Sequence, residues 1–328
     1  MKKKLSSLII FLICAMTCLN AVSIDARARG NAVLTSEDVS YAFSHNPAFL
    51  ASSDFSLEIP LSARLYNASG ILKNDFISNL SDIASMDQER MVSGILDFLR
   101  EFSGTMPLVS IEERIALTLF GMGASISASE RVITTGGSVA TNLSLDLRGT
   151  LSAGFAHKFD FDDGWSLAAG AILNLDYMIC TSPAGVETVV GILLDPDGSG
   201  DFSIYSGHAV SADIGINITY PLGFSTAFTV RNLGSAYHMN DDNGNSFTLP
   251  NPVEMDTAAG WKGSWSFLSL DLEIGMRGWN RIRSYPDLLE SLNAGASLGI
   301  TKFIDINLGL DGGYPSCGIT FDFLCFEI

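Results

Sequence analysis

Residues 210–220 read Val-Ser-Ala-Asp-Ile-Gly-Ile-Asn-Ile-Thr-Tyr, and apolar side chains alternate with polar or small ones along the whole stretch. Alternation with period two predicts a β-strand that has one apolar and one polar face. The length of the strand indicates the kind of sheet, because strands of globular proteins run about 5–6 residues. A strand that crosses a bilayer needs roughly 9–11 residues. Residues 210–220 are long enough to cross.

The same pattern recurs along most of the chain after residue 107, for example over residues 143–155, 165–177, 268–276 and 304–310. We expect about 12–14 antiparallel strands, near residues 55–66, 108–120, 122–133, 141–156, 165–178, 204–220, 223–232, 254–264, 266–278, 292–300, 303–311 and 315–327, with up to two more within 179–194. Only a closed barrel satisfies every backbone group of strands in lipid. The sequence therefore predicts an all-β fold, a transmembrane outer-membrane β-barrel over residues 54–328. The alternative is an exported soluble β-sandwich or β-solenoid.

The composition excludes several other classes of protein. Apolar residues make up 47% of the chain, which is too many for a disordered protein. The 36 acidic residues outnumber the 19 basic ones, and a net charge of −17 repels nucleic acid. No apolar run after the first 25 residues is long enough for a membrane-spanning helix.

Residues 1–26 have the order of a secretory signal peptide. Lys2–Lys4 precede an apolar run over Leu8–Ala15, and small residues follow it. Cleavage after Ser23 and cleavage after Ala26 both fit. Lipidation of Cys18 is an alternative, although the residues before it match a lipidation motif poorly. With the long alternating strands, the signal predicts a location in the cell outer membrane.

A helical insertion interrupts the strands over about residues 72–104. Its apolar residues recur with the spacing of a helix, at Met91, Ile95, Phe98, Leu99 and Phe102, and Gly104 and Pro107 end it. We expect either a packed excursion or a lid that forms one wall of a ligand site. Residues 285–292 form a shorter insertion of similar character.

Residues 27–53 precede the first strand and carry a short motif, whose residues are Asp38, Ser40, Ala42, Asn46, Pro47, Ala48 and Leu50. This stretch resembles the FadL-like superfamily of outer-membrane barrels, which contains the long-chain fatty-acid transporters and the PorV-type barrels. A second similarity runs from Ala212-Asp213-Ile214-Gly215 to Asn232-Leu233-Gly234. The C-terminal residues 316–323 resemble the last-strand signal that the barrel-insertion machinery reads.

The resemblance implies a 14-stranded barrel in which residues 27–53 fold inward as an N-terminal hatch. It further implies passage or binding of hydrophobic small molecules such as fatty acids. The candidate ligand-binding residues are Asn46, Pro47 and Phe49 of the hatch with Phe98, Leu99 and Phe102 of the insertion. The alternative is a PorV-like barrel that serves protein secretion or surface attachment by binding a partner protein. A general porin ranks third, because the hatch argues against it.

Polar chemistry inside the expected barrel is sparse. Inward positions hold acidic residues and Arg148, Arg231 and Arg277, which either pair across strands or line an acidic, cation-favouring pore. Residues 195–201 resemble the front of a calcium loop, with candidate ligands Asp195, Asp197, Ser199 and Asp201 but no glutamate at the twelfth position. An exposed loop is the alternative. No catalytic motif occurs, so we expect neither an enzyme nor a cofactor.

Overall fold

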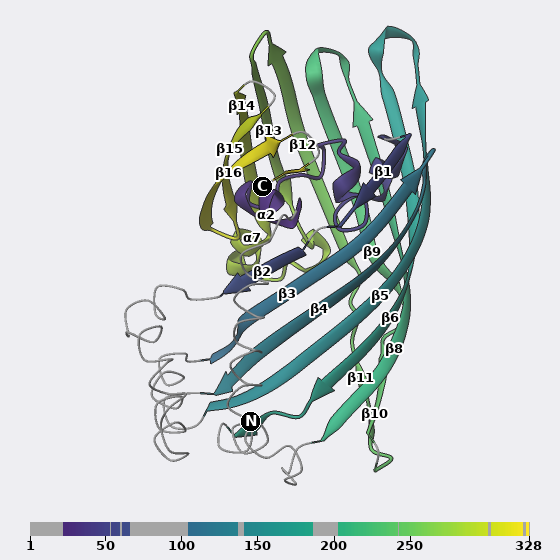
Figure 1. Ribbon diagram of the computed structural model, residues 1–328, viewed down its shortest axis with the longest axis vertical. Helices are drawn as coiled ribbons and strands as arrows, with labels where there is room; N and C mark the ends of the chain where they lie inside the picture. Colours follow the sequence, from purple (N-terminus) through teal and green to yellow (C-terminus); the bar gives the residue numbers. More distant parts are fainter. Residues whose placement is uncertain are drawn as a thin grey trace.

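The computed structural model describes residues 22–52, 54–59, 61–65, 104–136, 141–185, 203–241, 243–300, 303–323 and 326–327. Most of these residues belong to one sheet of 17 strand segments (Figure 1), and every pairing in it is antiparallel. The prediction of an all-β chain is confirmed at this level. The long segments are β3 (Gly104–Leu119), β4 (Met122–Gly136), β5 (Thr141–Asp160), β6 (Ser166–Thr181), β8 (Ile204–Thr219), β9 (Phe224–Gly234), β12 (Glu254–Trp265), β13 (Leu268–Met276), β14 (Leu292–Ile300), β15 (Ile304–Asp311) and β16 (Tyr314–Phe323).

The remaining elements are short. Short strand segments are β1 (Phe55–Glu58), β2 (Leu61–Leu65), β7 (Ala184–Gly185), β10 (Tyr237–Asp241), β11 (Ser246–Leu249) and β17 (Phe326–Glu327). Helical turns are α2 (Val22–Ala28), η1 (Val39–Tyr41), η2 (Pro47–Ser52), η3 (Asp162–Gly164), η4 (Pro221–Gly223), η5 (Trp279–Arg281) and α7 (Tyr285–Ser291). The helix α7 coincides with the shorter helical insertion that the sequence predicts, and a capping box at Ser284 and Asp287 begins it.

Most strands pair with their neighbours in the chain as successive hairpins. Four pairs of consecutive segments lie end to end. β1 and β2 both pair with β3, β6 and β7 both pair with β5, and β9 and β10 both pair with β8. The fourth pair, β11 and β12, lies beside β10 and β9. Joining these pairs reduces the 17 segments to 13 passes of the chain, the two-residue β17 included. This number lies within the predicted range of about 12–14.

The sheet curls strongly but is not closed into a barrel (Figure 1). Among the described residues, β16 pairs with β15 and β17, and no ladder joins it to β1 or β2. We call the line between β16 and β1–β2 the seam. The first and last parts of the sheet therefore face each other across two edges that do not pair.

The two faces of the sheet have the opposite polarity to those of a soluble protein. Along β6, the side chains of one face are buried and, apart from Ile172, small or polar, and Asp176 has no exposed surface at all. The apolar side chains of the other face are open, with exposed fractions of 59% for Leu173, 50% for Leu175 and 51% for Tyr177. We call the first the inner face and the second the outer face. The alternation predicted from the sequence is present, and it is the apolar side that lies outside.

Residues 22–52, here called the N-terminal segment, lie against the inner face (Figure 1, purple). Its apolar side chains, among them Val33, Tyr41, Phe49 and Leu50, form the largest buried cluster together with Ala156 of β5 and Ile172 of β6. Burying such side chains contributes about 1.5–3 kcal/mol each. The main apolar core of the described residues therefore lies between the N-terminal segment and the inner face of the strands, here called the wall.

Glycines on the inner face let the N-terminal segment approach the strands at backbone distance. A Cβ atom on Gly215 of β8 would lie 2.1 Å from Oδ1 of Asn46, and one on Gly170 of β6 would lie 2.4 Å from the carbonyl oxygen of Pro47. Gly295 of β14 meets the carbonyl oxygen of Arg29 in the same way. Any side chain at these positions would displace the segment, which explains glycine in mid-strand.

Several strand ends differ from the prediction by a few residues, and two further differences have a physical cause. The hairpin of β10 and β11 was not predicted, because each strand has only four or five residues. Strand β3 begins at Gly104, where the helical insertion was expected to end, and includes Pro107 at a register shift. Proline is tolerated there because a bulge removes the need for its missing N–H group.

Candidate functional site

Asn46 and Pro47 form the structural centre of the N-terminal segment. Asn46 is fully buried, where its Nδ2 donates to the carbonyl oxygen of Leu34 at 3.0 Å and its Oδ1 accepts from the amide of Ala48 at 3.1 Å. Pro47 is the first residue of η2, and the fixed φ of proline suits a first helical position. These bonds hold the turn rigidly, as expected for an asparagine before a proline.

The structure brings together three of the predicted ligand-binding residues. Asn46, Pro47 and Phe49 are all buried, in contact with the wall or with the rest of the segment, and none of them lines the cavity described below. Phe98, Leu99 and Phe102 lie outside the described residues, as do the calcium-loop candidates Asp195, Asp197, Ser199 and Asp201.

A buried carboxylate on β13 holds the middle of the N-terminal segment. Glu273 accepts hydrogen bonds from the amides of Leu34 at 2.8 Å and Thr35 at 2.7 Å, and from the Thr35 hydroxyl at 2.6 Å. Two residues away on the same strand, Asp271 pairs with Arg29 at 2.9 Å. Hydrogen bonds to a charged group are the stronger kind, and each contributes about 1.5–3 kcal/mol.

The helix α2 connects the two sides of the seam. On one side Asp25 accepts hydrogen bonds from Asn307 of β15 and, at 3.1 Å, from Thr320 of β16. On the other side Arg27 pairs with Glu112 of β3 at 2.8 Å. The two ends of the open sheet are thus joined through side chains of this helix rather than through a backbone ladder.

Asp25 also fixes the interior of the N-terminal segment. The Tyr41 hydroxyl donates to Oδ2 of Asp25 at 2.5 Å. Burial raises the pKa of Tyr41 well above its ordinary value of 10.0, and the negative charges of Asp25 and Asp38 raise it further. Tyr41 therefore stays protonated and donates this bond throughout the physiological range.

A cavity of about 570 Å³ lies between the N-terminal segment and strands β2 to β12. Its lining is mainly polar, with serines of β4 and amides of β6 and β9 among the charged groups. Four carboxylates line it, Glu112, Glu113, Asp213 and Glu254. Six arginines line it too: Arg27, Arg114, Arg131, Arg148, Arg231 and Arg277. The lining thus holds more arginines than carboxylates, in a chain of net charge −17.

Some of these charges brace neighbouring strands. Arg148 of β5 pairs with the fully buried Asp176 of β6 at 2.9 Å. Arg231 of β9 pairs with Asp256 at 2.8 Å and with Glu254 at 3.1 Å, both on β12. Pairing across strands was one of the two interpretations open from the sequence, and these arginines follow it.

Two of the cavity arginines have no carboxylate within ion-pair distance among the described residues. These are Arg114 on β3 and Arg277 at the end of β13. Arg277 was among the inward positions identified from the sequence, whereas Arg114 was missed. The alternation of Ile115, Leu117 and Leu119 outward would have placed Arg114 on the inner face.

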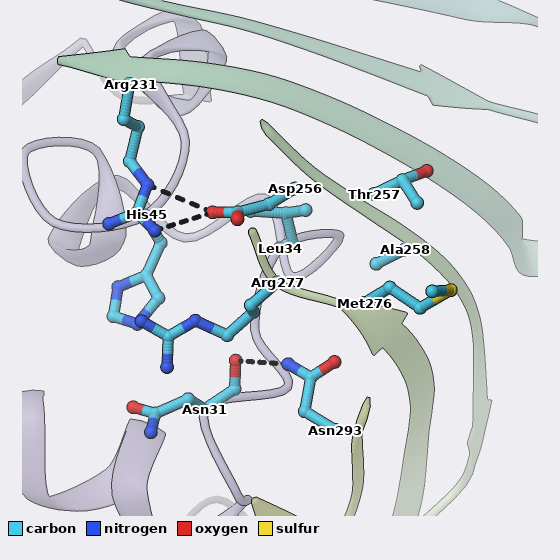
Figure 2. A pocket seen from close by; sticks show the side chains of 10 residues that line it. All are labelled: Asn31, Leu34, His45, Arg231, Asp256, Thr257, Ala258, Met276, Arg277 and Asn293. Atoms are coloured by element: carbon cyan, nitrogen blue, oxygen red, sulfur yellow. Dashed lines mark hydrogen bonds and ion pairs between the residues drawn. The ribbon is translucent and has the colours of Figure 1, made fainter. Parts of the chain in front are cut away.

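His45 of the N-terminal segment lies beside these arginines, in a small recess of about 10 Å³ that adjoins the cavity. Figure 2 shows its imidazole between the guanidinium groups of Arg231 and Arg277. Burial lowers the pKa of His45 well below its ordinary value of 6.5, and the positive charges of Arg277, Arg231, Arg114 and Arg27 lower it further. The imidazole is therefore neutral at neutral pH. The sequence offered no sign of this role, because His45 has no metal-ligand spacing.

The chain matches no protein-family model, and no curated protein is similar to it. Within the described part of the chain, no helix has the length and apolar character needed to cross a membrane. The described residues likewise contain no group of three or more His, Cys, Asp or Glu arranged to hold a metal ion.

Proposed function

We propose that the protein is an outer-membrane β-barrel whose N-terminal segment acts as a hatch over a lumen that binds or passes small molecules. The observation that carries this proposal is the polarity of the sheet. Its outer face is apolar and open along strands of up to 20 residues, and its inner face is polar and covered. Contiguous exposed apolar surface of this extent is rare on soluble monomers. Strands of this length exceed what a bilayer crossing needs.

The signal-like N-terminus supports export to the outer membrane, and the place of the Asn46-Pro47 turn supports the proposed kinship with the FadL-like superfamily. We further propose that the barrel closes in the membrane where β16 meets β1 and β2. Barrel closure needs the first and last strands to be antiparallel, and the 12 passes from β1–β2 to β16, without β17, are an even number that makes them so. In the barrel, β16 would be the strand that the insertion machinery reads.

The polar cavity bears on the route of a hydrophobic molecule such as a fatty acid. Its charged lining offers such a molecule little, because apolar ligands bind in predominantly apolar pockets. The proposed route is therefore lateral, from lipid into the seam, where side chains of α2 and no backbone ladder join the two edges among the described residues. Displacement of the N-terminal segment would open this route and the lumen together.

The second candidate is a PorV-like barrel that binds a protein of a secretion or surface-attachment system. The observation in its favour is the tight packing of the N-terminal segment, which contacts the wall at backbone distance and through buried charges. A segment so tightly held suits a permanent plug better than a gate that moves often.

Liposome swelling separates the two candidates. We expect vesicles that contain the wild-type protein to swell slowly in isosmotic solutions of small solutes. The Glu273→Gln variant, which weakens the seat of the N-terminal segment, should swell faster. Asp287→Asn, a change of the same kind on the surface helix α7, should behave as wild type. If hydrogen exchange shows the segment released and swelling still does not change, the gate proposal is wrong and the partner-binding candidate gains.

Hydrophobic ligands need a direct test. Native mass spectrometry of the protein from mild detergent should show a bound apolar molecule if the lateral route is used. An empty protein that crosslinks in the cell envelope to one specific neighbour would favour the second candidate instead.

A further inference from the structure

We infer that the cavity under the N-terminal segment is a binding site for a small organic polyanion, a molecule that carries two or more phosphate or carboxylate groups. The inference concerns the inner surface of the sheet and goes beyond the proposed hatch. It holds whether or not the ligand crosses the membrane, because it requires only binding.

The first support is the balance of charge in the cavity. Its six arginines outnumber its four carboxylates, although acidic residues outnumber basic ones almost twofold in the whole chain. One of the four carboxylates, Glu254, is already paired with Arg231, and another, Glu112, is already paired with Arg27. Two carboxylates outside the lining, Asp176 and Asp256, pair with Arg148 and Arg231, so the cavity arginines left without an ion pair among the described residues are Arg114 and Arg277.

The second support is a pair of arginines without an ion pair among the described residues, although the charges of Glu58 and Glu112 act on Arg114 from farther away. Arg114 and Arg277 reach the cavity from β3 and from the end of β13, with no carboxylate in ion-pair range among the described residues. A guanidinium withdrawn from bulk water is costly unless an anion or hydrogen-bond acceptors compensate it. The planar fork of an arginine fits carboxylate and phosphate oxygens in a bidentate manner.

The third support is the geometry of the recess in Figure 2. The guanidinium of Arg277 lies beside the His45 imidazole, and that of Arg231 lies on its other side. All three residues line both the recess and the large cavity. The recess itself has room for about one water, so an acidic group would lie in the large cavity at its mouth, beside His45, Arg231 and Arg277.

The volume of the cavity indicates how large a ligand it can hold. Small-molecule sites commonly enclose about 300–1,000 Å³, and this cavity holds about 570 Å³. A single inorganic ion would leave most of it empty. A compact molecule with one acidic group near Arg277 and another near Arg114 would use both arginines and the polar serine-rich wall of β4.

Isothermal titration calorimetry on the full-length protein in neutral detergent tests the inference. The probes are tripolyphosphate and citrate, with inorganic phosphate as a smaller reference, at low salt and neutral pH. We expect saturable one-to-one binding of at least one polyanion, more tightly than phosphate. Stronger binding of tripolyphosphate would identify a phosphate ligand, and stronger binding of citrate a carboxylate ligand.

Variants locate the site. Arg114→Gln and Arg277→Gln should each weaken binding about tenfold or more, the usual effect of losing a hydrogen bond to a charged group. Neither change breaks an ion pair among the described residues, although the charge of Arg114 also stabilises the Glu58 carboxylate, so circular dichroism spectra check that both proteins fold. Arg277→Lys, which keeps the charge, should weaken binding less than Arg277→Gln. Arg283→Gln, on an exposed arginine outside the cavity, should leave binding unchanged.

Two results would overturn the inference. One is the absence of saturable binding for both polyanions at millimolar concentration. The other is binding that Arg114→Gln and Arg277→Gln leave as tight as in the Arg283→Gln control.

Discussion

Replacing Glu273 by glutamine should release the N-terminal segment from the wall while changing almost nothing in the volume of the side chain. The carboxylate of Glu273 accepts three hydrogen bonds, from the amides of Leu34 and Thr35 and from the Thr35 hydroxyl. A glutamine keeps one oxygen that accepts, but its NH2 group is itself a donor and faces donors of the segment. At least one buried N–H group or hydroxyl group therefore loses its acceptor.

The size of the effect follows from these bonds. A hydrogen bond to a charged acceptor contributes about 1.5–3 kcal/mol, and a buried donor left unmatched costs about 1–3 kcal/mol. The cost of burying the carboxylate in the wild-type protein offsets part of this, since the variant no longer buries a charge. We expect a net loss of about 2–4 kcal/mol in the free energy that seats the segment. At 1.36 kcal/mol per factor of ten, local opening becomes roughly 30- to 1000-fold more frequent.

Hydrogen–deuterium exchange with mass spectrometry measures this opening directly, because the two affected amides are themselves the reporters. Peptides that contain Leu34 and Thr35 should exchange faster in Glu273→Gln by the factor given above, while peptides of β6 keep wild-type protection. Asp287→Asn on α7, which also removes a carboxylate that accepts backbone hydrogen bonds, is the matched control. Wild-type protection of Leu34 and Thr35 in Glu273→Gln would refute the seat described for this segment.

Three further predictions concern the same segment. Gly170→Ala should weaken the packing of the N-terminal segment on the strands by about 1–3 kcal/mol, since the new Cβ would lie 2.4 Å from a carbonyl oxygen of the segment. Gly149→Ala, whose Cβ would meet nothing within 4 Å, should leave hydrogen exchange of the segment unchanged. Burial and neighbouring arginines lower the pKa of His45, so stability that depends on the neutral imidazole should be full above pH 6.5 and fall as the pH drops through 6.5 towards the lowered pKa. His45→Gln should remove this part of the pH dependence of hydrogen exchange. An equal pH dependence in that variant would contradict the prediction. Mass spectrometry of the mature N-terminus should show cleavage after Ser23 rather than three residues later, because the later cut would remove Asp25 and its bonds to both the segment and the last strands.

Much of the sheet could be predicted from the sequence because strand periodicity is a local property. Leu173, Leu175 and Tyr177 share one face in the sequence pattern and one exposed face in the structure. The short strands β10 and β11 were missed because four or five residues give too few alternations to detect. Local pattern thus determined the long strands and failed on the short ones.

The candidate site could be predicted only in part, since its contacts join residues far apart in the chain. Asn46 and Pro47 were identified through a motif, but their contact with Gly215 depends on the fold. The role of Glu273 was not accessible either, because its partners are mainly backbone amides, which every non-proline residue has. His45 became notable only when the strands brought arginines to it.

The bonds of α2 also constrain the order in which the protein can assemble. Asp25 leaves the ribosome well before two of its partners, Asn307 and Thr320, which lie 282 and 295 residues later in the chain. Contacts of such long sequence separation form late, because the intervening chain must be ordered first. The N-terminal segment must therefore wait unseated while the hairpins form and can dock only after β15 and β16 are in place. A chain that ends before β15 would keep its hairpins and still leave its beginning exposed to proteases, so cleavage near α2 would report whether the last strands have folded.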